Sequence, residues 1–190
     1  NEDGGIISSL VNFGCHPVTI YPSLSTSISA DYPAHATGVV EQAEGGLCLF
    51  ALGLAGNAVP YERGVSQCRQ IGRALGGEAV RRLQFVSTSG DVAVRGIRKE
   101  VVFPAKKDGS ASENARSIVT EFQVLRLGDI YILGLPGEIL VEVGLAIKER
   151  AGIENLFIVT LSNDAIGYVC PAAAYDEGGY EPAGATDLAK

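Results

Sequence analysis

The chain has 190 residues, of which 46% are hydrophobic and 19% are charged; this composition is typical of a folded globular segment and excludes an intrinsically disordered one. No apolar run approaches the roughly 20 residues that a membrane-spanning helix needs. The net charge is −7 and the 15 basic residues are scattered along the chain, which argues against nucleic acid as a partner.

The chain begins at Asn1, contains no methionine and shows no signal-peptide pattern. We therefore expect a fragment, a processed chain or one domain of a longer protein. The four cysteines are widely spaced and form no CxxC pair, which predicts neither a zinc finger nor a compact disulfide framework. Cys48 and Cys68 flank apolar segments and are expected to be buried thiols.

The first half of the chain predicts alternating strands and helices. Residues 6–15 have the apolar pattern of a strand, and residues 34–43 follow a connector rich in proline, serine and threonine as a short helix. Residues 46–54 form a continuous apolar run between glycines, the pattern of a strand buried on both faces. Residues 65–83 place apolar side chains at helical spacing with arginines opposite, although glycines weaken this helix.

A hairpin is predicted in the middle of the chain. Residues 91–104 and 120–127 alternate apolar and polar side chains, as half-exposed antiparallel strands do, and the polar stretch 106–114 between them predicts a loop. Gly128 and Asp129 predict a tight turn into a strand at residues 130–135.

The last third predicts one further helix and one further strand. An amphipathic helix is expected from Gly137 to about Ala151, followed by a buried strand at residues 155–161, and the residues from Asn163 onward are predicted mainly as loop. The predicted fold class is α/β: one domain over residues 1–190, with a layered mixed β-sheet and flanking helices.

Four segments share one pattern, in which an apolar strand ends and polar residues, glycine or proline begin. They are residues 13–17, 54–57, 135–138 and 161–164. In open α/β sheets the carboxyl ends of strands form a crevice where ligands bind. If these four strands are neighbours, we expect His16, Asn57, Glu138 and the 163–168 loop to converge.

His16 is one of only two histidines and ends an apolar run just before a proline. Neutral imidazole is the commonest protein ligand for zinc, and a strand end would hold it rigidly in a cleft. The alternative is a hydrogen-bonded histidine at a strand end with no metal.

Glu138 is predicted at a strand-to-helix junction, where two explanations are open. The helix dipole favours a carboxylate in the first turn by about 0.3–1 kcal/mol, or the residue is an oxygen ligand or general base. The tyrosines of the glycine-rich tail, Tyr168, Tyr175 and Tyr180, are either packing anchors or contribute a ligand or hydrogen-bond donor.

Taken together, these segments resemble the neutral/alkaline (non-lysosomal) ceramidase family, most closely its bacterial relatives of undefined substrate. The resemblance covers nearly the whole chain, extends to Tyr175 and Gly179-Tyr-Glu181, and corresponds to the middle and later parts of the family's catalytic domain. Five motifs carry it in order: Asn-Phe-Gly-Cys-His16-Pro, Ser29-Ala-Asp-Tyr-Pro33, Gly56-Asn-Ala-Val-Pro60, Leu135-Pro-Gly-Glu138 and Asn163-Asp-Ala-Ile-Gly-Tyr168.

The resemblance implies a zinc amidase, since the family cleaves the N-acyl bond of ceramide. It implies that His16, Glu138 and Tyr168 are ligands of Zn²⁺ and that a metal-bound water is the nucleophile. It places Tyr180 and Asn57 in the catalytic site, with the Tyr180 hydroxyl donating a hydrogen bond near the scissile carbonyl.

The chain departs from the family at two places. The family's upstream Thr-His-Thr-His-Ser-Gly motif supplies a further zinc ligand and a substrate-binding histidine, and this chain has no such motif. His35, expected at the surface or at a helix cap, does not replace it, so a complete site needs a segment before Asn1 or another chain. Val59 stands where the family has its catalytic serine, and a valine can neither attack a carbonyl nor donate a hydrogen bond.

The sequence therefore predicts a ceramidase-like, zinc-dependent hydrolase of an amide or related acyl bond, acting on a small-molecule or lipid-like amide. The alternative is a catalytically inactive ligand-binding domain that keeps the cleft, and a third interpretation leaves the strand-end residues as packing alone. The resemblance favours a secreted or periplasmic location.

Overall fold

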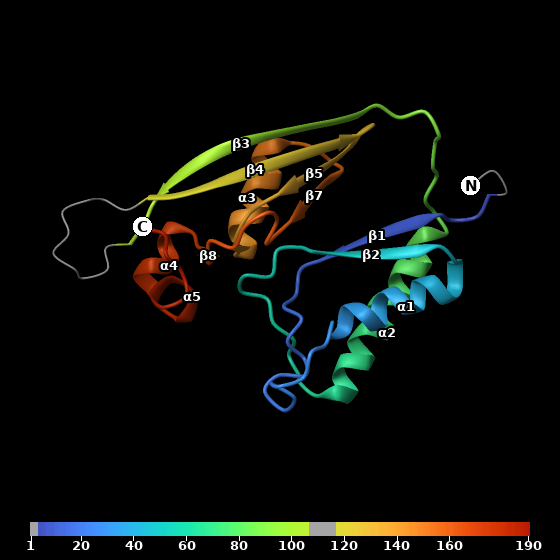
Figure 1. Cartoon of the computed structure of the whole chain (residues 1–190), viewed down its shortest axis with the longest axis horizontal. Coiled ribbons are helices and arrows are strands. Elements are labelled where there is room, and N and C mark those ends of the chain that lie inside the picture. The colour runs from blue at the N-terminus through green and yellow to red at the C-terminus, as the bar shows by residue number, and fades with distance from the viewer. Residues whose placement is uncertain (1–3, 107–116) are drawn as a thin grey trace. The chain divides into compact units, whose positions relative to one another are not determined.

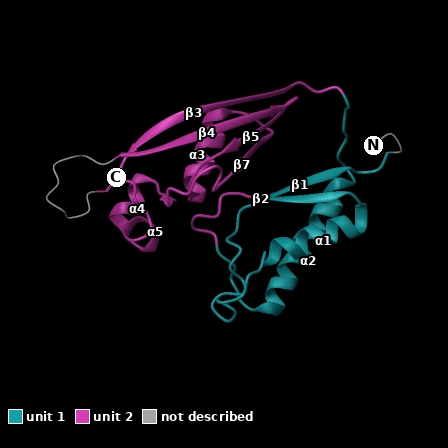
Figure 2. Cartoon of the chain, in the orientation of Figure 1, with its two compact units in different colours: residues 1–51, 59–90 teal, residues 52–58, 91–190 magenta. Residues whose placement is uncertain are grey.

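The computed structural model describes residues 4–106 and 117–190 (Figure 1). Apart from Lys106, the loop predicted at residues 106–114 lies outside the described residues. The chain divides into two compact units: unit 1 comprises residues 1–51 and 59–90, and unit 2 comprises residues 52–58 and 91–190 (Figure 2). The organisation as one domain stays a prediction.

Unit 1 contains a two-stranded sheet and two helices packed on each other. The sheet pairs β1 (Ser8–Phe13) with β2 (Leu47–Leu52, whose last residue belongs to unit 2), and the helices are α1 (Tyr32–Glu44) and α2 (Val65–Leu83). The four elements predicted for this part of the chain are confirmed. Helix α1 begins where the Asp31 side chain accepts a hydrogen bond from the N–H of Tyr32, with a proline in the first turn.

Strand β2 is buried on one face only, so the prediction of burial on both faces is wrong. Cys48 is 6% exposed, but its neighbours Leu47 and Leu49 are 56% and 50% exposed. Successive side chains of a strand point to opposite faces, and the helices of unit 1 lie on one side of this sheet (Figure 1). The apolar run thus supplies both a buried and an exposed face of this strand.

Glycine, together with Cys68, forms the buried face of α2. The buried residues of this helix are Cys68, Gly72 and Gly76, one turn apart. A Cβ on Gly72 would lie 2.6 Å from the carbonyl oxygen of Tyr32, and one on Gly76 would lie 2.6 Å from that of Ala36. The glycines that weaken α2 by propensity are therefore what lets α1 approach it closely.

Unit 2 is built on a four-stranded mixed sheet. The sheet order is β3 (Val94–Pro104), β4 (Ser117–Leu127), β5 (Ile130–Gly134) and β7 (Leu156–Val159). The first two pairings are antiparallel and β5 pairs with β7 in parallel. The predicted hairpin is confirmed, since Leu127 is the partner of Ile130 across a turn in which Gly128 has φ 62°.

Helix α3 (Val141–Ala151) connects β5 to the parallel strand β7. The buried core beneath it contains Leu135, Ile139, Leu156 and Ile158, with side chains of α3 packed against them. Leu135, Leu156 and Ile158 come from the apolar runs that predicted strands, whereas Ile139 lies in a segment predicted as helix and observed in β6. The burial of these four side chains fixes the sheet against the helix.

The tail is more ordered than predicted. It contains β8 (Tyr168–Val169), α4 (Ala172–Glu177) and α5 (Tyr180–Ala183), and β8 pairs with β6 (Glu138–Ile139). The α/β fold class, with multi-stranded sheets and flanking helices, is confirmed. Among residues 4–106 and 117–190, no helix has the length and apolar character to cross a membrane.

Candidate active site

Glu138 and Tyr168 lie side by side on two short parallel strands. They begin β6 and β8 and are partners in the register of this pair. Burial, then the hydrogen bond with the Glu138 carboxylate and the charge of that carboxylate, raise the pKa of the Tyr168 hydroxyl. The phenol therefore keeps its proton at neutral pH and donates a hydrogen bond to the Glu138 carboxylate. Unit 2 thus holds a carboxylate and a phenol together at one position.

Glycine allows these two strands to approach each other. A Cβ on Gly137 would lie 2.7 Å from the carbonyl oxygen of Gly167. The N–H of Glu138 donates to that same carbonyl at 2.9 Å, and the N–H of Leu140 donates to Val169 at 3.1 Å. The Leu-Pro-Gly-Glu motif therefore places Glu138 by bringing its backbone against β8.

The prediction that Glu138 lies in the first turn of a helix is wrong. Helix α3 begins at Val141 after the N-cap Leu140, and the acidic residue of its first turn is Glu142. The pairing with β8 keeps the backbone of Glu138 extended, so the helix-dipole explanation applies to Glu142 instead.

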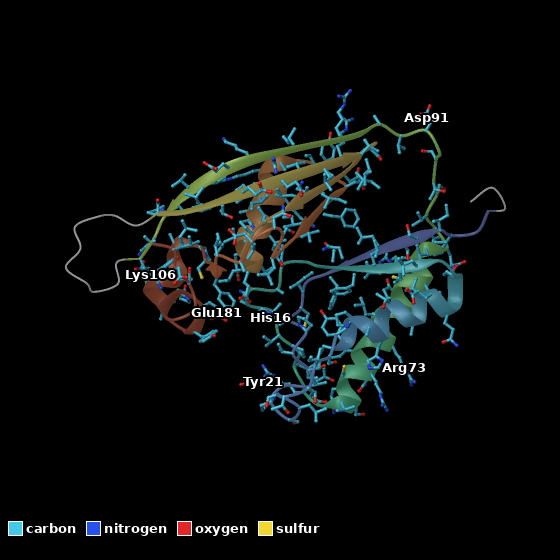
Figure 3. The ribbon with its side chains drawn as sticks, viewed as in Figure 1. His16, Tyr21, Arg73, Asp91, Lys106 and Glu181 are labelled. Atoms are coloured by element: carbon cyan, nitrogen blue, oxygen red, sulfur yellow. The ribbon has the colours of Figure 1, made fainter. Side chains whose placement is uncertain are left out.

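Tyr180 joins this pair through its ring. The ring centroids of Tyr168 and Tyr180 are 6.0 Å apart with an interplanar angle of 75°, an edge-to-face contact. Tyr180 is 70% exposed, so a ligand can reach it. The adjacent Glu181, labelled in Figure 3, adds negative charge that further raises the pKa of Tyr168. We call Glu138, Tyr168 and Tyr180 the tyrosine–glutamate cluster.

Three of the four strand-end segments meet within unit 2, as expected. The N–H of Gly56 donates to the carbonyl of Ile139 at 2.9 Å, and the N–H of Leu161 donates to that of Gly137 at 3.2 Å. The turn after β2, the segment after β5 and the segment after β7 are therefore joined backbone to backbone beside the tyrosine–glutamate cluster.

Asn57 holds the start of α3. Its Oδ1 accepts the N–H of Val141 at 2.9 Å, and its Nδ2 donates to the Glu142 carboxylate at 3.0 Å. The N-cap Leu140 makes no side-chain hydrogen bond, so Asn57 supplies from another segment what an N-cap side chain normally supplies. The arrangement gives Asn57 a positioning role, and its predicted role in catalysis stays a prediction.

We expect Asn57→Ala to lower the free energy of unfolding by about 1 kcal/mol, because the first turn of α3 loses its capping acceptor. Asn155→Ala is the matched control, since Asn155 is also exposed and its side chain donates to Asp129 at 3.4 Å, while its backbone bond to Tyr131 is kept in alanine; it should change stability by less than about 0.5 kcal/mol. Urea titration followed by circular dichroism measures both. Equal losses in the two variants would rule out the capping role.

His16 belongs to unit 1. It follows β1 and is half-buried, and its carbonyl accepts the N–H of Val18 at 2.9 Å in a tight turn (Figure 3). Its place at a strand end is as predicted. The other predicted site residues belong to unit 2, so the predicted ligand set is divided between the units. Val59, at the serine position of the resemblance, is in unit 1 and is 54% exposed.

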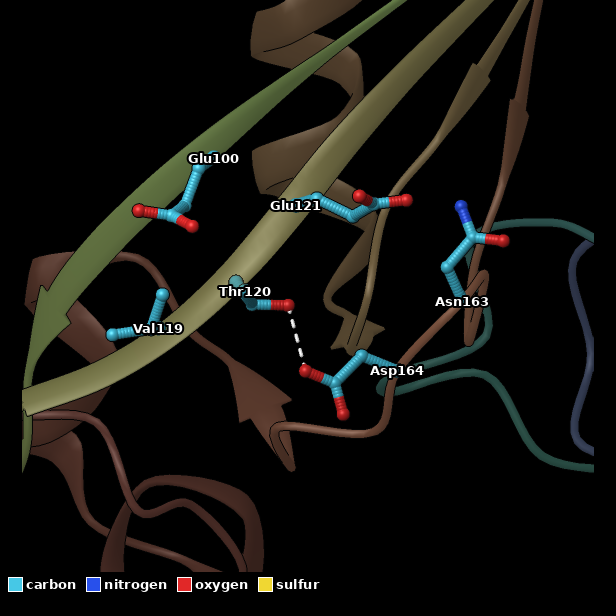
Figure 4. A pocket seen from close by; sticks show the side chains of 6 residues that line it. All are labelled: Glu100, Val119, Thr120, Glu121, Asn163 and Asp164. Atoms are coloured by element: carbon cyan, nitrogen blue, oxygen red, sulfur yellow. Dashed lines mark hydrogen bonds between the residues drawn. The ribbon is translucent and has the colours of Figure 1, made fainter.

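Two surface pockets contain none of the five residues predicted as zinc ligands or catalytic groups. One, of about 600 Å³, lies on α2 and is lined by Ser66, Arg69, Gln70 and Arg73. The other, of about 210 Å³, lies in unit 2 and is lined by Glu100, Val119, Thr120, Glu121, Asn163 and Asp164 (Figure 4). Sequence reasoning indicated only Asn163 and Asp164, as a strand end, because the other four lie inside strands with no local signal.

Asp164 is held at the edge of the unit 2 pocket by a hydrogen bond. The hydroxyl of Thr120 donates to its Oδ2 at 2.8 Å, and the N–H of Ala165 donates to its Oδ1 at 2.8 Å. These two hydrogen bonds, the first being the stronger influence, hold the pKa of Asp164 below its usual range. The carboxylate is therefore ionised at neutral pH and fixes the loop after β7 against β4.

Within residues 4–106 and 117–190, no three histidine, cysteine, aspartate or glutamate side chains are grouped so that they could hold a metal ion. The ligand set implied by the resemblance has two residues of these types, His16 and Glu138, with a phenol as the third. The Glu138 carboxylate and the Tyr168 phenol both offer oxygen atoms as ligands. A divalent cation could bind these oxygen atoms in place of the proton in their hydrogen bond.

No protein-family model matches the chain, and no curated protein sequence matches it. Among solved structures, the neutral ceramidase from Pseudomonas aeruginosa is similar with a TM-score of 0.74 and 17% sequence identity, over 95% of this chain and 41% of that chain. A ceramidase complexed with C2 is similar with a TM-score of 0.71 and 16% identity, over 95% of this chain and 42% of that one.

The chain thus spans less than half the length of the ceramidases it matches. The resemblance seen in the five sequence motifs is confirmed at the level of the fold: this chain has the fold of part of a neutral ceramidase.

Proposed function

We propose that this chain is part of a zinc-dependent, ceramidase-like hydrolase that cleaves an amide or related acyl bond. The observation that carries the proposal is the pairing of Glu138 with Tyr168 on β6 and β8, within a fold shared with neutral ceramidase over 95% of the chain. Two residues that the motifs single out separately are neighbours in space, and their oxygen atoms are of the kind that hard and borderline cations bind.

In this proposal His16, Glu138 and Tyr168 hold the zinc ion, and a histidine outside this chain is a further ligand. A bound zinc ion would polarise the acyl carbonyl and lower the pKa of a water molecule to about 7. The edge-to-face contact keeps Tyr180 beside Tyr168, and its exposed hydroxyl can donate a hydrogen bond to the carbonyl oxygen as negative charge develops there.

Asn57 acts on the same site indirectly. It fixes the start of α3, which follows Glu138 by three residues, and so limits the movement of the strand that carries this carboxylate. Val59 contributes no hydroxyl, so the step that the family's serine performs has no counterpart at this position. The substrate we propose is therefore an N-acyl amide or an ester, with ceramide as one member of the test panel.

A ligand-binding domain without catalysis is the second candidate. The observation that favours it is Val59, because a binding domain has no need of a hydroxyl at that position. It predicts that amide ligands still bind while no zinc is retained and no acyl bond is cleaved.

Zinc content of the full-length protein tests the proposal. We expect about one zinc per chain, with an affinity at least 100-fold weaker in His16→Ala, Glu138→Gln and Tyr168→Phe, because a site that loses a direct ligand is impaired more than the 10–100-fold seen for outer-shell changes. Metal analysis after dialysis and calorimetric titration with Zn²⁺ give these values, and a panel of N-acyl amides and esters gives the activity.

Each variant has a matched control in the same unit. His35→Ala removes the other histidine of unit 1, Glu142→Gln neutralises the next glutamate after Glu138, and Tyr175→Phe removes the hydroxyl of a nearby tyrosine. The controls should keep the zinc. A native protein that binds no zinc, or one whose zinc affinity survives in folded His16→Ala and Glu138→Gln, would refute the proposal.

A further inference from the structure

The segment from Ser29 to Pro33 is one of the five motifs, yet it contains no residue of the proposed site. Its two central residues, Asp31 and Tyr32, are 4% and 0% exposed. Asp31 is the N-cap of α1, and Tyr32 is the first residue of that helix. Their side chains contact the segment that carries His16, so the reason for this motif is found in unit 1 itself.

The Tyr32 side chain is hydrogen-bonded to Cys15, the residue directly before His16. Its hydroxyl donates to the carbonyl oxygen of Cys15 at 2.5 Å. Its ring makes edge-to-face contacts with Phe13 and Phe50, with centroids 6.1 Å and 5.8 Å away. The ring thus packs between β1 and β2, and the hydroxyl adds one directed bond at the point where β1 ends.

The Asp31 carboxylate is hydrogen-bonded to Thr19 and Ile20, which follow His16 in the chain. Its Oδ1 accepts the hydroxyl of Thr19 at 2.5 Å, and its Oδ2 accepts the N–H of Ile20 at 3.1 Å. Burial alone would raise the pKa of this carboxyl, but the hydrogen bonds from Thr19, Tyr32 and Ile20 outweigh burial and lower it. Thr19 is itself fully buried, and its carbonyl accepts the N–H of Gly64 at 2.6 Å.

The backbone of Asp31 is in a conformation that residues with a side chain rarely adopt. Its φ is 56° and its ψ is −152°, a region populated almost only by glycine. A residue persists in such a conformation only where the surrounding structure holds it there, and the Asp31 side chain is hydrogen-bonded to that structure. Here those bonds go to the segment after His16 and to the N–H of Tyr32 at 2.8 Å.

We propose that Asp31 and Tyr32 are positioning residues that hold the His16 segment from both sides, at Cys15 and at Thr19 with Ile20. Between these anchors the chain makes the turn in which Val18 donates to His16. With both ends fixed, the backbone of His16 has one orientation before any ligand binds. The inference rests on the proposed role of His16 as a zinc ligand.

Two variants of the full-length protein each remove one anchor with little change of shape. Tyr32→Phe removes the hydroxyl but keeps the ring contacts, and Thr19→Val removes the hydroxyl that Asp31 accepts. Tyr61→Phe and Thr37→Val are the controls, since Tyr61 is 85% exposed and the hydroxyl of Thr37 bonds only within α1. Thermal unfolding establishes that each variant is folded, and Tyr32→Phe decides alone if Thr19→Val does not fold.

The first measurement needs no metal. In NMR spectra of the zinc-free full-length protein, the ring signals of His16 and His35 are assigned by their loss in His16→Ala and His35→Ala. We expect the His16 signal to shift or split in both anchor variants, while the His35 signal, from the helix that carries Tyr32, stays in place. The second measurement is zinc affinity, expected to fall about 10–100-fold in both anchor variants and in neither control.

A shifted His16 signal together with weaker zinc binding supports positioning. If folded Tyr32→Phe leaves the His16 signal unchanged, positioning is overturned, whether zinc binding falls or not. If the native protein binds no zinc, the proposed function fails, and the His16 signal alone then decides whether Asp31 and Tyr32 position this residue.

Discussion

Gly76→Ala and Gly77→Ala, the same substitution at adjacent positions of α2, are expected to change stability in opposite directions. A Cβ on Gly76 would lie 2.6 Å from the carbonyl oxygen of Ala36 and 2.7 Å from Cβ of Val39. Neither atom can rotate away, so α1 and α2 must separate, which costs about 1–3 kcal/mol. A Cβ on Gly77 meets nothing within 4 Å, so alanine there should stabilise the helix by about 1 kcal/mol.

Circular dichroism during thermal unfolding separates the two outcomes. A change of 1 kcal/mol moves the midpoint by roughly 2–4 °C for a chain of this length, so the two variants should differ by about 4–16 °C. Gly38→Ala, in α1, is a second control because a Cβ there also meets nothing within 4 Å. A Gly76→Ala protein as stable as Gly77→Ala would show that the two helices do not pack through this glycine.

Sequence reasoning succeeded where a pattern is local. The bounds of α2 follow from apolar residues at helical spacing, and the turn at Gly128 and Asp129 follows from the few residues that tolerate positive φ. The same reasoning treated the glycines of α2 as a weakness. Their role depends on a second helix lying against them, and no property of residues 65–83 reveals that neighbour.

The candidate site was predictable only in part for a similar reason. The motifs indicated Glu138 and Tyr168 one by one, but their pairing depends on two strands of two residues each. Strands this short have no periodicity to detect. No local sequence pattern indicated the structural role of Asp31 and Tyr32. Their side chains form hydrogen bonds to Thr19 and Cys15, which lie more than ten residues away in the chain.

Several motif residues are explained by backbone contact. Gly56 and Gly137 lie where another backbone approaches within 2.7 Å of the position a Cβ would take. Asn57 and Asp31 hold the starts of two helices. Contacts of this kind fix the backbone around the candidate site, so a motif residue can be needed for the fold without itself supplying a chemical group.

Gly137→Ala is expected to damage both the stability of unit 2 and the tyrosine–glutamate cluster. Its Cβ would lie 2.7 Å from the carbonyl of Gly167 and 3.1 Å from side-chain atoms of Ile166 and Val169. Because the backbone of Gly167 cannot yield without breaking its bond to Glu138, β6 and β8 must move apart. We expect a loss of about 1–3 kcal/mol in the free energy of unfolding and zinc binding about 10–100-fold weaker.

Gly184→Ala is the matched control for this prediction. The nearest atom to a Cβ on Gly184 is the carbonyl oxygen of Tyr180 at 3.8 Å, and its φ of −117° suits alanine. It should leave stability within about 0.5 kcal/mol and leave zinc binding unchanged. Chemical unfolding and zinc titration on the same samples separate the two effects. If Gly137→Ala loses stability but binds zinc as the native protein does, the pairing of β6 with β8 is not what places Glu138 beside Tyr168 for a cation, and the ligand set must be sought elsewhere in the chain.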